Sequence, residues 1–278
     1  MKKRLMAAVL STAMAATMLL TGSISVQAAD AAAANDPAVE LIFTSVSVSG
    51  DSHTEAMYEF ADKVEELSGG SVTCKCYDNG SLFSSENEFD ALLNGDADLA
   101  YISFPTIATQ IPSYSMFASG YLFSSYEHMT SVLNGDIGLN KIRPQIEETL
   151  NIKPLSSFYL GSRVINTREK EINSYDDMNG LLLRMPNSEA WLFLGEALGA
   201  NPTPLSFSEL YTALQTGAVD AQDNPLPSIE SAKFYEVTKY IAITNHVVDS
   251  IMPCINGDTW NSMTEAQQEA VTEAMEYA

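Results

Sequence analysis

The chain has 278 residues, of which 14 are basic and 36 acidic, so its formal net charge is −22 at pH 7. This excess of negative charge repels nucleic acid and anionic lipid surfaces, and we expect neither as a partner. The length allows a signal segment followed by one large or two medium domains.

Residues 1–28 have the pattern of a secretory signal peptide. A basic start, "MKKR", precedes an apolar run from Leu5 to Leu20, and small residues before the cut favour cleavage after Ala28. A lipoprotein signal would need Cys where Ser23 stands, so we expect no lipid anchor. Removal of Lys2, Lys3 and Arg4 with the signal leaves 11 basic and 36 acidic residues, a net charge of −25. The pattern predicts a periplasmic or other extracytoplasmic protein.

The first half of the remaining chain alternates between strand and helix patterns. In chain order we expect strand, helix, strand, helix and strand over residues 41–50, 57–67, 71–77, 86–94 and 97–103. The first helix is marked by apolar residues at helical spacing, and Gly95 closes the second. Such alternation predicts a parallel-rich α/β sheet with helices on both faces.

The pattern restarts near residue 161. We expect a strand and turn over 155–167, then strand, helix, helix and strand over 181–186, 187–198, 207–216 and 218–222. A helix followed by a strand covers 228–244, and a long extended run at 246–257 can cross between lobes. Capping boxes are predicted at Ser206 with Glu209 and at Thr264 with Gln267. The last helix shows no stop signal, so we expect that further C-terminal helices are cut off.

One short frame occurs twice. Ala-Leu-x-x-Gly-x-x-Asp starts at Ala91 and again at Ala213, 122 residues later. Each copy would end a helix at Gly and send a short strand to the edge of a sheet, with the Asp bonding nearby amides. Chance or ordinary turn chemistry remains an equal explanation.

The two α/β patterns, one in each half of the chain, predict two lobes. We expect lobe I to comprise 38–160 and 250–278, and lobe II to comprise 161–249.

The segment from Gly180 to Pro225 resembles the DctP-like solute receptors of TRAP (tripartite ATP-independent periplasmic) transporters. Its text is "GLLLRMPNSEAWLFLGEALGANPTPLSFSELYTALQTGAVDAQDNP", and "FADKVEELSGG" and "AKFYEVTKYIAITNH" fit the same family. The resemblance implies a two-lobed periplasmic-binding-protein-like fold with a ligand cleft between the lobes. It also implies a receptor that captures a small organic acid and delivers it to membrane permease subunits.

The resemblance places ligand contacts on Arg184, Asn224, Arg163, Phe207 and Asn187. Arg184 in the Leu-Arg-Met-Pro strand would grip the ligand carboxylate with two parallel hydrogen bonds, because a guanidinium matches a carboxylate in shape and stays charged. Asn224 would hold the same carboxylate, and Arg163 would add a second guanidinium from a Gly-x-Arg turn. From lobe I we expect hydroxyls such as Ser103, Ser85 or Ser45.

One departure narrows the ligand. Where the sialic-acid receptors carry acidic and amide side chains in lobe I, this chain has Val46, Ser85 and Ile102. These residues do not replace the lost hydrogen bonds, so sialic acid itself is a poor fit. A C4-dicarboxylate, an aromatic or keto acid, or a uronate stays open.

Other chemistry finds little support in the sequence. We expect no cofactor and no metal, because His53, His128 and His246 are scattered without ligand spacing. A bridge from Cys254 to Cys74 or Cys76 stays open. A secreted enzyme acting on organic acids lacks a recognisable catalytic motif. A sensor module that partners a membrane receptor is the other alternative.

Overall fold

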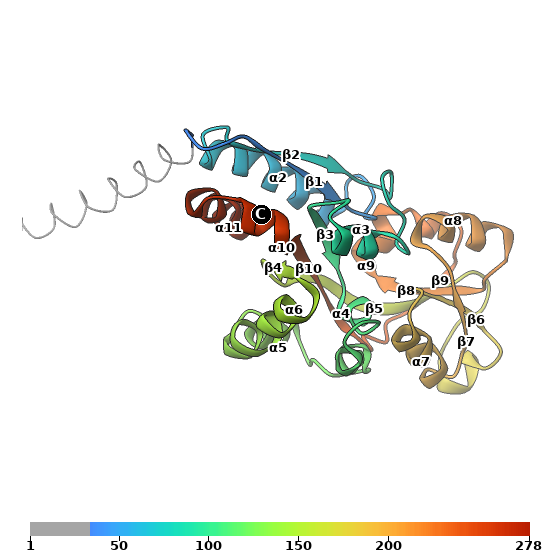
Figure 1. The fold of residues 1–278 in the computed structure, drawn as a ribbon. Coiled ribbons are helices and arrows are strands. Elements are labelled where there is room, and N and C mark those ends of the chain that lie inside the picture. The colour runs from blue at the N-terminus through green and yellow to red at the C-terminus, as the bar shows by residue number, and fades with distance from the viewer. Residues whose placement is uncertain (1–33) are drawn as a thin grey trace, which may run out of the picture.

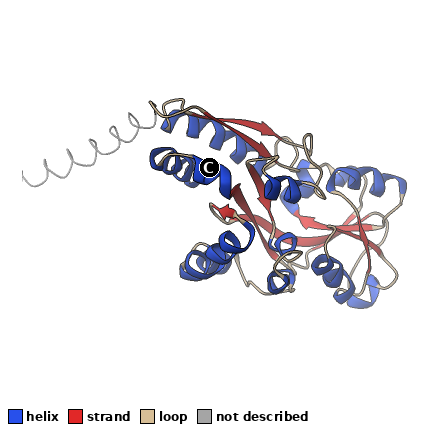
Figure 2. Ribbon diagram, viewed as in Figure 1, coloured by secondary structure: helices blue, strands red, loops and turns tan. Residues whose placement is uncertain are grey.

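The computed structural model describes residues 34–278 and shows one mixed ten-stranded sheet covered by helices on both faces (Figures 1 and 2). The signal peptide expected over 1–28 lies outside these residues. The strands are β1 (Val39–Thr44), β2 (Val72–Tyr77), β3 (Leu99–Ile102), β4 (Ile152–Pro154), β5 (Phe158–Thr167), β6 (Leu182–Met185), β7 (Asn201–Pro204), β8 (Ala221–Pro225), β9 (Tyr240–Ala242) and β10 (Val248–Asn256). The α-helices are α2 (Ser52–Leu67), α3 (Glu88–Asn94), α4 (Phe104–Ile107), α5 (Tyr126–Leu133), α6 (Arg143–Leu150), α7 (Glu189–Ala197), α8 (Phe207–Thr216), α9 (Leu226–Ser231), α10 (Gly257–Ser262) and α11 (Glu265–Tyr277).

The two halves of the sheet are built alike. Read inward from its edge, each half has its second strand first, then its first strand, its third strand and a long central strand. The order runs β2-β1-β3-β10 from one side and β7-β6-β8-β5 from the other. We call the half that carries β1–β3 lobe I and the half that carries β6–β8 lobe II. Two long strands join them, because β5 and β10 pair with each other at Val248 to Ser162 and then continue into opposite lobes. The extended run predicted at 246–257 is therefore a crossing strand.

Helices bury both faces of each lobe. In lobe I, α2 and α11 lie side by side on one face, where Phe60 of α2 packs on Phe43 of β1. Helices α3 to α6 cover the other face. In lobe II, neighbouring residues of β5 point to opposite faces, so Ile165 joins the core beneath α7 and Val164 joins the core beneath α8.

The repeated frame is one structural device used in both lobes. Gly95 and Gly217 end α3 and α8 with φ of 76° and 81°, conformations that glycine adopts at little cost. Asp98 Oδ2 then accepts the amide of Ile42 in β1 at 2.8 Å, and Asp220 Oδ2 accepts the amide of Leu182 in β6 at 3.0 Å. Each aspartate thus fastens the end of a helix to the neighbouring parallel strand.

Several sequence expectations need correction. The expected parallel pairing is confirmed within the lobes, where β1 pairs with β2 and β3 and β6 pairs with β7 and β8, but the crossing strands β5 and β10 pair antiparallel with all their neighbours. Residues 158–167 form one strand rather than a strand and turn, because Gly161 (φ 130°) lets the strand pass Pro225, where an added Cβ would come within 2.4 Å. The hydroxyl of Ser206 donates to the Glu209 carboxylate at 2.9 Å, but it accepts no amide of the helix, so the expected capping box is not formed.

One capping box is confirmed and one strand is shifted by a few residues. The box at Thr264 and Gln267 is present. The strand expected at 218–222 lies at Ala221–Pro225, which moves Asn224 into the strand itself.

All three cysteines are free. Within residues 34–278, no helix has the length and apolar character to cross a membrane, and no His, Cys, Asp and Glu side chains cluster as metal ligands.

The hydrogen bonds of Asp98 are expected to stabilise the folded protein. Asp98→Ala removes bonds to the Ile42 amide and to the Thr259 hydroxyl, which lies 2.6 Å from Oδ1. We expect the free energy of unfolding to fall by about 1–2 kcal/mol in urea denaturation. Asp96→Ala is the matched control, because Asp96 is exposed and its side chain makes no hydrogen bond within residues 34–278. Equal losses in the two variants would contradict the role of Asp98.

Candidate functional site

A cavity of about 340 Å³ lies between the lobes. Lobe I lines it with residues after β1, with the segment 85–90 and with the end of β3; lobe II lines it from β5, β6, α7, α8 and β8. Of the residues expected from the sequence, Ser45 does not line this cavity, because it is buried and accepts the Ser47 amide at 3.1 Å. The others all line it: Arg184, Asn224, Arg163, Phe207, Asn187, Ser103 and Ser85.

Arg184 is a buried cation without an acidic partner. Leu183 and Met185, its neighbours in β6, are buried in the lobe II core, so strand alternation turns Arg184 to the cavity side. The side chain is 2% exposed and its Nε donates to the Leu205 carbonyl at 2.8 Å, but no carboxylate of residues 34–278 forms an ion pair with it. Burial, with the nearby charge of Arg163, lowers the pKa of Arg184 to about 9, so it is still cationic at neutral pH.

Arg163 lines the same cavity, but its charge is compensated within the protein. Nε donates to Asp249 Oδ2 at 2.7 Å, and Nη1 donates to the carboxylate of Asp223 and, at 2.8 Å, to its carbonyl. The guanidinium also lies 4.2 Å from the ring centre of Trp191. Burial alone would lower the pKa of Arg163, but Asp249 and Asp223 outweigh it and hold the pKa above its ordinary value.

Asp223 connects this arginine to a buried histidine. Its Oδ2 lies 2.6 Å from Nε2 of His246, whose Nδ1 lies 2.7 Å from the Thr244 hydroxyl. Burial would raise the pKa of Asp223, but Arg163 and His246 lower it to about 2. The carboxylate is therefore ionised at neutral pH, and it holds β5, β8 and the start of β10 in one network.

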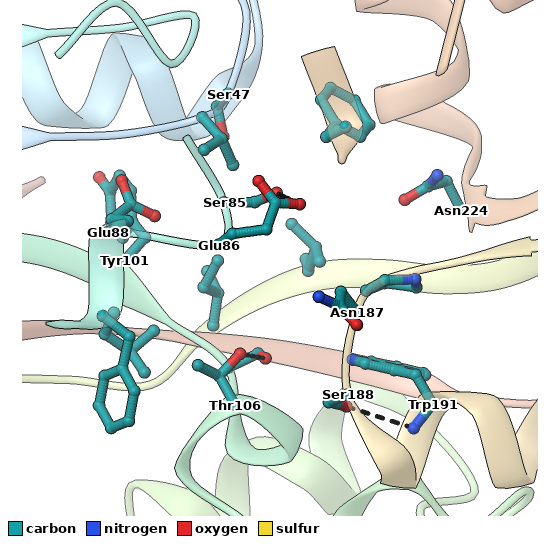
Figure 3. A pocket seen from close by; sticks show the side chains of 18 of the residues that line it. Ser47, Ser85, Glu86, Glu88, Tyr101, Thr106, Asn187, Ser188, Trp191 and Asn224 are labelled. Atoms are coloured by element: carbon teal, nitrogen blue, oxygen red, sulfur yellow. Dashed lines mark hydrogen bonds between the residues drawn. The ribbon is translucent and has the colours of Figure 1, made fainter. Parts of the chain in front are cut away.

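Asn224 follows Asp223 directly and is oriented by its neighbours. Its amide nitrogen donates to Gln222 Oε1 at 2.6 Å, and its oxygen lies 3.5 Å from Arg163 Nη1. Because a side-chain amide carries two N–H donors, one is left for the cavity. Asn187 is exposed at the start of α7, and its side chain projects into the cavity (Figure 3). Phe207 packs on Phe234, with 5.6 Å between ring centres, and also faces the cavity.

The lobe I wall is polar and acidic. Ser103 Oγ lies 2.9 Å from the Thr106 hydroxyl, and Ser85 donates to Glu86 at 3.1 Å. Glu88 is 5% exposed, and its Oε1 has no hydrogen-bond partner among the described residues. Figure 3 shows Ser47, Ser85, Glu86 and Glu88 on this wall, across from Asn224. The three departures from the sialic-acid receptors, at Val46, Ser85 and Ile102, all line the cavity.

Sequence reasoning missed the acidic and imidazole groups of the site. Asp223 stood inside the noted Gln-Asp-Asn-Pro motif, and Asp249 is a single acid within a largely apolar extended run, so each carried a usable signal. For Glu86 and Glu88 no signal separated them from the many other acids of the chain. His246 shows no local pattern, because its partner Asp223 is 23 residues away.

Comparison with known proteins places the chain among solute receptors. The family model of bacterial extracellular solute-binding proteins, family 7 (DctP), matches residues 43–278. The sialic acid-binding periplasmic protein SiaP of Vibrio cholerae is 33% identical over 216 residues, which cover 78% of this chain and 67% of SiaP. The chain spans about two thirds of the length of the curated relatives it matches.

Solved structures agree in fold. A TRAP periplasmic solute binding protein from Roseobacter denitrificans with bound 3-deoxy-D-manno-oct-2-ulosonic acid has 39% identity and a TM-score of 0.80, over 86% of this chain and 78% of that one. Another, from Sulfurospirillum deleyianum with bound succinate, has 26% identity and a TM-score of 0.81, over 87% and 77%. With its two-lobed fold and its match over residues 43–278, the chain belongs to the DctP family of bacterial extracellular solute-binding proteins, the family of the TRAP receptors.

Proposed function

We propose that this protein is the extracytoplasmic receptor of a TRAP transporter, which captures a small organic acid between its lobes and delivers it to membrane permease subunits. The observation that carries the proposal is Arg184, a buried guanidinium that faces the cavity without an acidic partner. An unpaired buried cation is costly. A carboxylate ligand would offset that cost, and two charge-assisted hydrogen bonds would contribute about 1.5–3 kcal/mol each.

The neighbouring groups support a carboxylate site. The free N–H of Asn224 would hold the acid beside Arg184, and Arg163, with Nε and Nη1 engaged, would offer its Nη2 edge. Phe207 would pack against the ligand, while Asn187 and Ser103 would form hydrogen bonds with its polar groups. The bound molecules named for three solved relatives, 3-deoxy-D-manno-oct-2-ulosonic acid, L-galactonate and succinate, all carry carboxylates.

Capture would involve closure of the two lobes about the strands that join them. We propose that lobe I comprises 38–160 and 250–278, that lobe II comprises 161–249, and that hinge motion occurs where β5 and β10 pass between them. Across the cleft, Ser231 of α9 donates to Asp51 at 3.1 Å, a contact that closure would form and opening would break. The family is made up of solute-binding proteins, and we infer that this chain binds its acid without converting it.

A screen of carboxylic acids by thermal shift tests the proposal. A bound acid is expected to raise the melting temperature, because saturation at 100 times Kd stabilises the fold by about 2.7 kcal/mol. The corresponding alcohols, which lack the carboxylate, are the controls and should leave the melting temperature unchanged. If no carboxylate in the panel shifts the transition, the receptor assignment fails.

The two buried arginines are expected to behave in opposite ways. Arg184→Met should weaken binding of the acid by about 100-fold or more, the equivalent of about 3 kcal/mol. It should leave the unfolding free energy of the ligand-free protein within about 1 kcal/mol, because no carboxylate loses a partner. Arg163→Met leaves Asp223 and Asp249 buried and uncompensated, so it should lower the unfolding free energy by about 3–5 kcal/mol.

Urea denaturation and calorimetric titration measure the two effects separately. Arg168→Met is the matched control, since Arg168 lies outside this cavity and should retain both affinity and stability. An Arg184→Met variant that keeps full affinity for the acid would rule out the carboxylate clamp.

A further inference from the structure

We propose that the ligand is a polyhydroxy monocarboxylic acid, with its one carboxylate on Arg184 and its hydroxyls against the lobe I wall, and that this wall discriminates against dicarboxylates. The inference rests on the proposed function and narrows its ligand class. The opposed charges of the two cavity walls carry it.

The cavity has one place for a carboxylate. Only two cationic side chains of the described residues line it, Arg163 and Arg184. Arg163 forms ion pairs with two carboxylates that compensate its charge, whereas no carboxylate of residues 34–278 forms an ion pair with Arg184. A dicarboxylate that bound Arg184 at one end would therefore have no cation for the other.

The opposite wall would repel a second carboxylate. Besides the buried Glu88, it carries Asp51, Glu86 and Asp90, and of these three only Asp51 forms an ion pair within the described residues, with His53 at 2.9 Å. Figure 3 shows Glu86 extending from this wall into the space that Asn187 also faces. Like charges brought together across the cavity disfavour the wrong ligand, which is how a site excludes a close analogue.

The same wall is suited to hydroxyl groups. Glu88 Oε1 is buried and has no partner within residues 34–278, and a buried polar atom in that state gains from a ligand that can bond to it. The hydroxyls of Ser47, Ser103 and Thr106 line the cavity beside it. A ligand hydroxyl both donates and accepts, so it can satisfy all of these groups.

Glu88 and the apolar lining of the cavity both fit a hydroxylated carbon chain. Burial raises the pKa of Glu88 well above its ordinary value, which favours the protonated carboxyl, a group that can both donate to and accept from a ligand hydroxyl. Phe207, Leu160 and Ile251 supply apolar surface, against which the C–H groups of a sugar-like chain can pack. The combination of apolar patches with a few convergent polar groups is usual for such pockets.

The test uses six-carbon ligands that differ at one carbon. Galactonate, galactarate and galactitol share a skeleton, as do gluconate, glucarate and glucitol, and each set steps from one carboxylate to two to none. Calorimetric titration is expected to show at least one aldonate binding about 10-fold or more tightly than its aldarate, with no binding of the alditols. Hexanoate, which has the carboxylate but no hydroxyls, is expected to bind at least about 10-fold more weakly than the aldonate.

Substitutions in the lobe I wall test whether its acidic side chains cause the preference for aldonates over aldarates. Glu86→Gln with Asp90→Asn should reduce the aldonate-to-aldarate affinity ratio by about threefold or more. Glu59→Gln with Asp62→Asn, which removes the same charge from exposed positions of α2 outside the cavity, should leave that ratio unchanged. Glu88→Gln, a neutral donor and acceptor, should keep most of the aldonate affinity, whereas Glu88→Leu should lose about 10-fold or more while its melting transition shows that it is folded.

The outcomes separate the two proposals. If succinate, an aldarate or an α-amino acid binds more tightly than every aldonate, the inference about the ligand class is overturned and the carboxylate receptor stands. Equal binding of hexanoate and the aldonates also overturns it. If no carboxylate of any class binds, the proposed function itself fails.

Discussion

The buried ion network around Arg163 is the constraint on which the site depends. It joins β5, β8 and β10 where the two lobes meet, because Arg163 holds Asp223 from one strand and Asp249 from another. Charges buried in this way are tolerated only when they are paired and hydrogen-bonded. The network orients Asn224, the next residue of β8. It also compensates the charge of Arg163, whereas the charge of Arg184 is not compensated by an ion pair within the described residues.

The two lobes are alike in architecture and opposite in chemistry. Both have the same inward strand order, and both fasten a helix end to a parallel strand through an aspartate, Asp98 or Asp220. Lobe II supplies the cation and the amide, and lobe I supplies hydroxyls and carboxyl groups. A ligand that we propose to be bound at both ends would need the two walls together, so its binding energy would favour the closed arrangement.

Much of the fold could be predicted because its signals are local. Helical spacing, glycine stops and the repeated Ala-Leu-x-x-Gly-x-x-Asp frame depend on residues close in sequence, and the structure shows the frame in the same role in both lobes. One error has a tertiary cause, since Gly161 lies in a continuous strand because β8 passes close beside it at Pro225. The other is local, since the Ser206 hydroxyl donates to the side chain of Glu209 and accepts no amide of α8.

The sequence by itself determined the two α/β units and the family resemblance, since both are marked by runs of adjacent residues. The resemblance in turn named five residues that line the cavity: Arg184, Asn224, Arg163, Phe207 and Asn187. Only the tertiary structure decided which arginine is compensated, because Asp249 is 86 residues from Arg163 and Asp223 is 60 residues from it. It also decided that Glu88 is buried without a partner while most other acids of this acidic chain face solvent. The electrostatic role of a charged side chain depends on its burial and on its distance from other charges in the folded protein. Neither quantity can be obtained from the order of residues along the chain.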